Sequence, residues 1–221
     1  MNCPSCAAPM SAQTLEGHLG TQVAIDVCSA CQVFWFDHLE SLRLSPGATL
    51  QLFRMIGAQP RASGPFPEPI KCPRCDMRLL ATTDRQRNTP FHYWRCPREQ
   101  GRLITFLDFL REKDFIRPLS PQQIAELRQQ IQMINCSSCG APIDLTQASA
   151  CAHCGAPISM LDVKQLSEAS RGHADQPAPA SGPDMAALFA ALRLEHDRDN
   201  SSRPGLVETG LRLVSEWLSA S

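Results

Sequence analysis

Pairs of cysteines separated by two residues constrain this chain more than any other feature. Eleven of its 221 residues are cysteine; ten of these form five C-x-x-C pairs, and Cys96 is single. Two intervening residues allow a tight turn to aim both sulfurs at one ion at ~2.3 Å, and a second turn completes a tetrahedron. An odd total fits disulfide pairing poorly. We therefore expect small modules folded around Zn²⁺.

Four of the pairs combine into two complete sites. Twenty-one residues separate Cys6 from Cys28, enough for a β-hairpin through 15–27, whereas eleven residues between Cys139 and Cys151 predict a compact double knuckle. Glycine follows Cys139 and Cys154, as a turn with positive φ prefers. The predicted zinc ligands are Cys3, Cys6, Cys28 and Cys31 in the first site, and Cys136, Cys139, Cys151 and Cys154 in the third.

A middle site has only three cysteines, Cys72, Cys75 and Cys96. We expect His92 to be its fourth ligand, because histidine with thiolates is ordinary zinc chemistry. Glu99 and Gln100 compete for that role. The remaining alternative is a site that holds no metal, with Cys96 packed as a small apolar side chain.

The fold expected is a set of metal-stabilised zinc ribbons, short β-hairpins with zinc knuckles, joined by short α-helices and ending in an α-helical tail. Pro- and Gly-rich sequence marks two linkers. The predicted parts are a ribbon with a helix at 1–56, a linker at 57–70, a second ribbon-like module at 71–118, a connecting helix at 119–134, a compact four-cysteine double knuckle at 135–166, a flexible linker at 167–183 and a helical tail at 184–221.

Apolar periodicity predicts the helices within these parts. Ser120 and Pro121 suit the N-cap and first position of a helix over 122–133. Short helices are expected at 37–42 and 50–56, and the tail shows helical spacing from Met185 to Leu192 and from Leu206 to Leu218. The tail helices either pack on the body of the protein or dock a partner or a second copy of the chain.

Charge is uneven along the chain, whose formal net charge is −1. Residues 71–117 carry eleven Lys/Arg and six Asp/Glu, and both flanks are acidic. Arginines beside stackable aromatics suit single-stranded nucleic acid. Arg85, Arg87 and Arg95 are therefore candidate nucleic-acid contacts, although such a charge run is more often a solvated face.

Other classes are disfavoured by what the sequence contains. A closed four-thiolate site has no open position for water, and neither a phosphate-binding glycine loop nor H-E-x-x-H occurs, so we expect no catalysis. No stretch reaches the ~18–20 apolar residues that span a bilayer. The opening Met1-Asn2-Cys3-Pro4 resembles no leader peptide, and we expect a cytoplasmic protein.

The first 55 residues resemble the bacterial TFIIB-type zinc-ribbon family. The resemblance rests on the two knuckles and on Trp35-Phe36-Asp37, an aromatic-acidic turn after the second knuckle, although Gln32 departs from the usual glycine. The segment around Cys96 is similar to a ribbon half of the form Cys-Pro-x-x-His-Gly, with Gln100 at the histidine position. The family name suggests transcription, but the resemblance implies zinc binding more than DNA binding.

Together these features favour a zinc-scaffolded adaptor that binds an unidentified protein partner, with a homo-oligomer through the C-terminal helices as one form of it. The alternative is a transcription-related protein that binds nucleic acid through residues 71–117.

Overall fold

The computed structural model describes residues 1–57, 66, 68–87, 89–162, 165, 187–188, 190–192 and 205–219. The chain divides into two compact units, Met1–Lys113 and Asp114–Ser221. The predicted linker at 167–183 lies outside the described residues, as does most of the one at 57–70. None of the described helices is long and apolar enough to cross a membrane.

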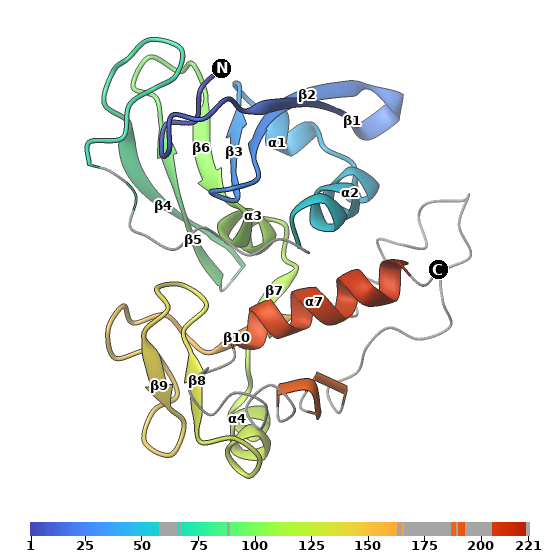
Figure 1. Cartoon of the computed structure of the whole chain (residues 1–221), viewed down its shortest axis with the longest axis vertical. Coiled ribbons are helices and arrows are strands. Elements are labelled where there is room, and N and C mark those ends of the chain that lie inside the picture. The colour runs from blue at the N-terminus through green and yellow to red at the C-terminus, as the bar shows by residue number, and fades with distance from the viewer. Residues whose placement is uncertain are drawn as a thin grey trace. The chain divides into compact units, whose positions relative to one another are not determined.

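Unit 1 is built on one antiparallel sheet of six strands (Figure 1). The strand order is β1-β2-β3-β6-β5-β4, so the two halves of the sheet come from separate stretches of chain. The strands are β1 (Ser11–Glu16), β2 (Gln22–Cys28), β3 (Val33–Phe36), β4 (Leu80–Gln86), β5 (Thr89–Arg95) and β6 (Arg102–Thr105). The helices are α1 (Glu40–Arg43), α2 (Pro46–Gly57), α3 (Phe106–Glu112) and a 3-10 turn at His18–Gly20.

Strands β3 and β6 join two copies of one ribbon. Trp35 pairs with Leu103, which holds the equivalent position in the second ribbon. On either side of this pair, Phe34 pairs with Ile104, the equivalent of Phe36, and Phe36 pairs with Arg102, the equivalent of Phe34. Trp35 follows Cys28 by seven residues, as Leu103 follows Cys96. In each ribbon the residue before the first cysteine forms an antiparallel bridge, Asn2 to Pro9 and Lys71 to Arg78. The sequence modules predicted at 1–56 and 71–118 thus contribute one ribbon each to a single sheet.

The two faces of this sheet have different partners. Val33, Trp35 and Leu103 lie on one face, in a single buried cluster with cysteines of both the first and the middle metal site. Phe34 and Phe36 point to the other face, where the ring of Phe109 in α3 lies 5.3 and 5.6 Å from theirs. Both aromatics of the predicted turn, Trp35 and Phe36, are fully buried. They pack the core, as an aromatic residue beside a zinc knuckle usually does.

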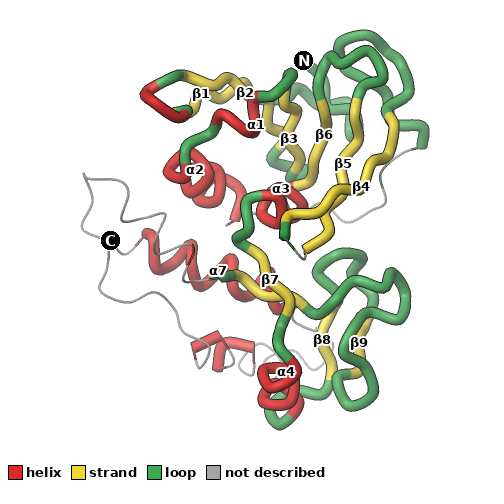
Figure 2. The backbone as a smooth tube through the Cα atoms, turned by 180° about the vertical axis from the view of Figure 1, so that it is seen from behind, coloured by secondary structure: helices red, strands yellow, loops and turns green. Residues whose placement is uncertain are grey.

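Unit 2 contains two small antiparallel pairs, β7 (Ile116–Pro118) with β10 (Ser159–Leu161) and β8 (Met133–Asn135) with β9 (Pro142–Asp144). Its described helices include α4 (Pro121–Arg128) and α7 (Leu206–Ser219), drawn in red with the other helices in Figure 2. One buried cluster combines side chains of α4, the double knuckle and the C-terminal helical residues.

Helix α4 begins as predicted and ends earlier. The Ser120 side chain accepts a hydrogen bond from the Gln123 amide, and the Gln123 side chain accepts one from the Ser120 amide, a complete capping box. The helix ends at Arg128, whereas the prediction extended it to Met133. Met133 and Ile134 instead form β8 against β9. Apolar spacing alone did not separate the last helical turn from a short buried strand.

The predicted C-terminal helix is present as α7 and packs within unit 2. Leu206, Val207, Leu211 and Val214 are buried, and α7 contacts β10. The approach is close at Gly210, where an added Cβ would lie 3.0 Å from a methyl carbon of Leu161. This face is therefore covered by the unit itself. Association of two chains through the C-terminal helices stays a prediction.

Substituting Gly101 tests the junction between the ribbons. Its φ is +140°, and an added Cβ would lie 2.3 Å from the Phe36 carbonyl oxygen. We expect Gly101→Ala to lower the free energy of unfolding by about 3 kcal/mol in denaturant titration, because both the backbone conformation and the packing oppose it. Gly20→Ala is the matched control, since Gly20 also has positive φ but nothing within 4 Å of the added carbon. Equal losses in the two variants would contradict this assignment.

Candidate metal centres

The fold brings the cysteines together in three clusters. In each cluster all the sulfur atoms lie within 4.8 Å of one another. The clusters are Cys3, Cys6, Cys28 and Cys31, then Cys72, Cys75 and Cys96, and finally Cys136, Cys139, Cys151 and Cys154. All eleven predicted cysteine ligands are thus placed in the combinations that their spacing suggested.

The separations of the sulfurs suit a shared metal ion. Sulfur pairs lie 3.7 Å apart between Cys6 and Cys28, 3.7 Å between Cys136 and Cys154, and 3.5 Å between Cys75 and Cys96. A tetrahedron with zinc–sulfur bonds of ~2.3 Å has edges of about 3.8 Å, and all eleven cysteines are free thiols. The donor set therefore fits Zn²⁺, which the protein would hold through thiolates alone at two sites.

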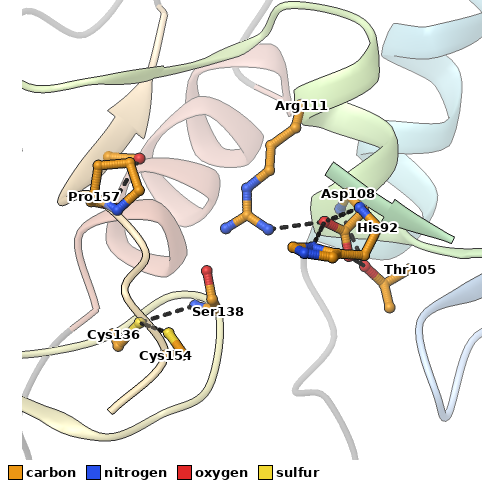
Figure 3. Close-up of polar contacts among 9 residues, drawn as sticks. His92, Thr105, Asp108, Arg111, Cys136, Ser138, Cys154 and Pro157 are labelled. Carbon is orange, nitrogen blue, oxygen red and sulfur yellow. Dashed lines mark hydrogen bonds and ion pairs between the residues drawn. The ribbon is translucent and has the colours of Figure 1, made fainter. Parts of the chain in front are cut away.

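The backbone of each knuckle is shaped to present these sulfurs. In four knuckles an amide two residues after the first cysteine donates to its sulfur at 3.4 Å; Figure 3 shows the one from Ser138 to Cys136. The residue after the second cysteine has positive φ, as predicted at Gly140 and Gly155. Non-glycine residues also adopt this conformation, at Ala7, Gln32 and Asp76. The turn therefore also forms at Gln32, where the family that the first 55 residues resemble usually has glycine.

The thiols crowded within one cluster differ in pKa. Burial raises the pKa of Cys154 to about 12. Burial also acts to raise the pKa of Cys151, but amides of Cys154 and His153 donate to its sulfur and lower the pKa to about 7. Several thiolates cannot share such a small volume without a cation. A bound dication removes this conflict, and its binding would release protons.

The structure does not bring His92 to the middle cluster. His92 lies within β5, paired with Thr83, and it is not among the groups gathered around Cys72, Cys75 and Cys96. In an extended strand four residues span about 13 Å, which separates His92 from Cys96. The other two candidates are also placed elsewhere: the Glu99 carboxylate is not in the cluster, and the Gln100 amide donates to the Arg98 carbonyl at 3.2 Å.

His92 instead lies, exposed, beside the buried carboxylate of Asp108, the centre of a polar network (Figure 3). The Asp108 carboxylate accepts hydrogen bonds from the His92 amide at 3.1 Å, Arg111 at 2.9 Å and the Thr105 hydroxyl at 2.8 Å. The His92 ring nitrogen Nδ1 lies 3.7 Å from the same carboxylate, which raises the pKa of His92. Asp108 thereby accepts a hydrogen bond from the backbone amide of His92, which lies just before the residues of β5 that pair with β6.

Asp37, the acidic residue of the aromatic turn, links the two ribbons of unit 1. Its carboxylate accepts a hydrogen bond from the Trp35 indole at 2.7 Å and another from Nε of Arg74 at 3.1 Å. Arg74 lies inside the knuckle of the middle site, between Cys72 and Cys75. Sequence reasoning missed this pair, because the two residues are 37 positions apart.

A cavity of about 740 Å³ opens within unit 1 between α1, the end of α3 and strands β4 to β6. Phe91 and Tyr93 contribute aromatic surface, and Leu39 and Leu42 line it while each remains 61% exposed. Arg102 lies over the Tyr93 ring at 5.0 Å and forms an ion pair with Glu112 at 2.6 Å.

The candidate nucleic-acid contacts fall in different places. Arg85 and Arg95 both line this cavity and are exposed. Arg87 is exposed in the turn after β4 and does not line it. Other arginines of the basic segment are engaged within unit 1, among them Arg74, Arg102 and Arg111.

Comparison with protein-family models, with curated proteins and with solved structures finds no match. The TFIIB-type resemblance of the first 55 residues therefore stays an expectation, while the three cysteine clusters stand on their own geometry.

Metal counting tests the ligand assignment. We expect the native protein to bind three equivalents of zinc, and Cys139→Ser with Cys154→Ser to remove one of them, measured by elemental analysis after desalting. His92→Ala should leave the count unchanged, because His92 lies outside the cluster. Loss of an equivalent in His92→Ala would restore the original prediction.

Titration of His92 tests the network around Asp108. Because the carboxylate raises the pKa of His92 above 6.5, the protonated ring stabilises the fold below that value, and this contribution is lost as pH rises through the folded pKa. We expect the His92 pKa, followed by NMR of the ring protons, to fall in Asp108→Asn. An unchanged value would contradict the pairing. Thr83→Ala, on the strand beside it, is the control.

Proposed function

We propose that this protein is a non-catalytic binding module, in which zinc-stabilised ribbons hold a surface for a protein partner. The observation that carries the proposal is the cavity of unit 1, where two leucines with exposed side chains border an aromatic floor. Exposed leucine beside aromatic surface is typical of interaction sites. The cavity is lined by polypeptide that the metal clusters and the shared sheet stabilise, so the surface depends on the metal.

The charges around the cavity favour a protein partner over a polyanion. Arg85 and Arg95 are accompanied by Asp84 and Glu99, so the lining of the cavity carries charges of both signs. Glu112 is paired with Arg102. An apolar segment flanked by polar groups matches such a surface, and its binding would depend weakly on salt.

The two exposed leucines provide a direct test. We expect Leu39→Asp with Leu42→Asp to reduce capture of the partner from the protein's own cells at least tenfold, a loss of ~1.4 kcal/mol. Stability should change little, because both side chains are already exposed. Leu19→Asp is the matched control, since Leu19 is fully exposed and lies away from the cavity. Equal capture by the leucine pair variant and wild type would reject this surface.

Nucleic-acid binding is a second candidate, favoured by the position of Arg85 and Arg95 at the same cavity as Phe91 and Tyr93. Aromatic rings beside arginine suit stacked bases. For this function we expect Arg85→Ala with Arg95→Ala to weaken binding of single-stranded oligonucleotides and to reduce the salt dependence of the affinity by about two ions. Binding that is nuclease-resistant and insensitive to salt would instead support the protein partner.

A further inference from the structure

The repeat within unit 1 gives each ligand of the first metal site a counterpart in the middle site. Both ribbons have a knuckle before the first strand and another between the second and third strands. Twenty-one residues separate the two knuckles in the first ribbon and twenty in the second. The equivalent positions are Cys3 and Cys72, Cys6 and Cys75, Cys28 and Cys96, and Cys31 and Glu99.

The knuckle that begins at Cys96 keeps the closed turn of the other knuckles, although it lacks the second cysteine. The Cys96 amide donates to the Gly101 carbonyl at 2.9 Å, as the Cys72 amide does to Met77 at 2.8 Å. The Arg98 amide donates to the Cys96 sulfur at 3.4 Å. Cys96 is therefore presented as a metal ligand is in the complete knuckles.

Glu99 occupies the position of the missing cysteine but is turned away from the sulfurs. Its φ is +56°, whereas in the first ribbon the positive φ falls one position later, at Gln32. Its carboxylate lies outside the group formed by the three sulfurs, and Glu99 is exposed and lines the cavity. The backbone of this knuckle thus leaves one corner of the tetrahedron without a ligand from Glu99.

We infer that the middle cluster is an open metal site, in which Cys72, Cys75 and Cys96 hold the ion and the fourth position takes an exogenous thiol or imidazole donor. Three protein ligands with one open position distinguish exchangeable sites from closed structural ones. Soft donors are preferred because the three thiolates select a thiophilic ion. The inference rests on metal binding by the clusters and not on the protein partner proposed above.

The middle cluster adjoins the cavity of unit 1. Cys75 is only partly buried. Cys96, Glu99 and Gly101 border the cavity of about 740 Å³, to which neither four-cysteine site contributes a residue. The first and third sites have all four ligands in the chain, so a response to added donor distinguishes the middle site from them.

Cobalt substitution with imidazole as the probe tests the inference on the full chain. The d–d bands of Co²⁺ report its ligands, and we expect three equivalents to bind. Added imidazole should shift the bands of one equivalent and leave those of the other two unchanged. Cys75→Ser removes one ligand of the middle cluster, and it should abolish the shift.

Variants of the three competing residues decide whether the chain itself supplies the fourth ligand. Glu99→Gln, Gln100→Ala and His92→Ala should each keep both the wild-type spectrum and the shift with imidazole. A changed spectrum in any one of them would identify that residue as the ligand and overturn the inference. It is equally overturned by binding of only two equivalents, by an absent shift in the wild type, or by a shift that survives in Cys75→Ser. These spectroscopic outcomes keep their meaning even if the protein captures no partner protein.

Discussion

The antiparallel pairing of β3 with β6 is the interaction on which the rest of unit 1 depends. A three-stranded ribbon alone leaves an open strand edge and buries little apolar surface. Pairing along Trp35 and Leu103 removes one edge from each ribbon and joins their cores, so that cysteines of two metal sites line one buried cluster. On the opposite face it aligns Phe34 and Phe36 under α3. The shared buried cluster, the packing of α3 and the cavity all follow from this sheet.

Cysteine spacing, helix-capping residues and apolar periodicity predicted the parts of the fold that are local. The sulfur clusters, the β-hairpin of the first ribbon, the start of α4 at Ser120 and the range of α7 each depend on residues close in sequence. The β3–β6 junction could not be predicted in this way, because its two strands lie on opposite sides of a Pro- and Gly-rich segment. The repeat itself had a signal, since the two ribbons share knuckle spacing and the position of Trp35 and Leu103.

The error at His92 has a physical origin. Sequence proximity placed it near Cys96, but a strand carries residues four apart to well-separated points. The histidine then finds a carboxylate, Asp108, that also binds Arg111. The basic excess of residues 71–117 has a similar explanation. Arg74, Arg102 and Arg111 are engaged by acidic groups of the same unit, so composition overstated the positive charge available to a ligand.

The arrangement of the two ribbons is that of an isologous dimer within a single polypeptide. In a true homodimer every substitution appears twice, and loss of one cysteine would damage both metal sites. Here the halves are covalently distinct, and the second can carry Glu99 where the first carries Cys31. Covalent linkage thus frees one half to diverge while its twin preserves the shared architecture, which is the advantage of tandem duplication over self-association.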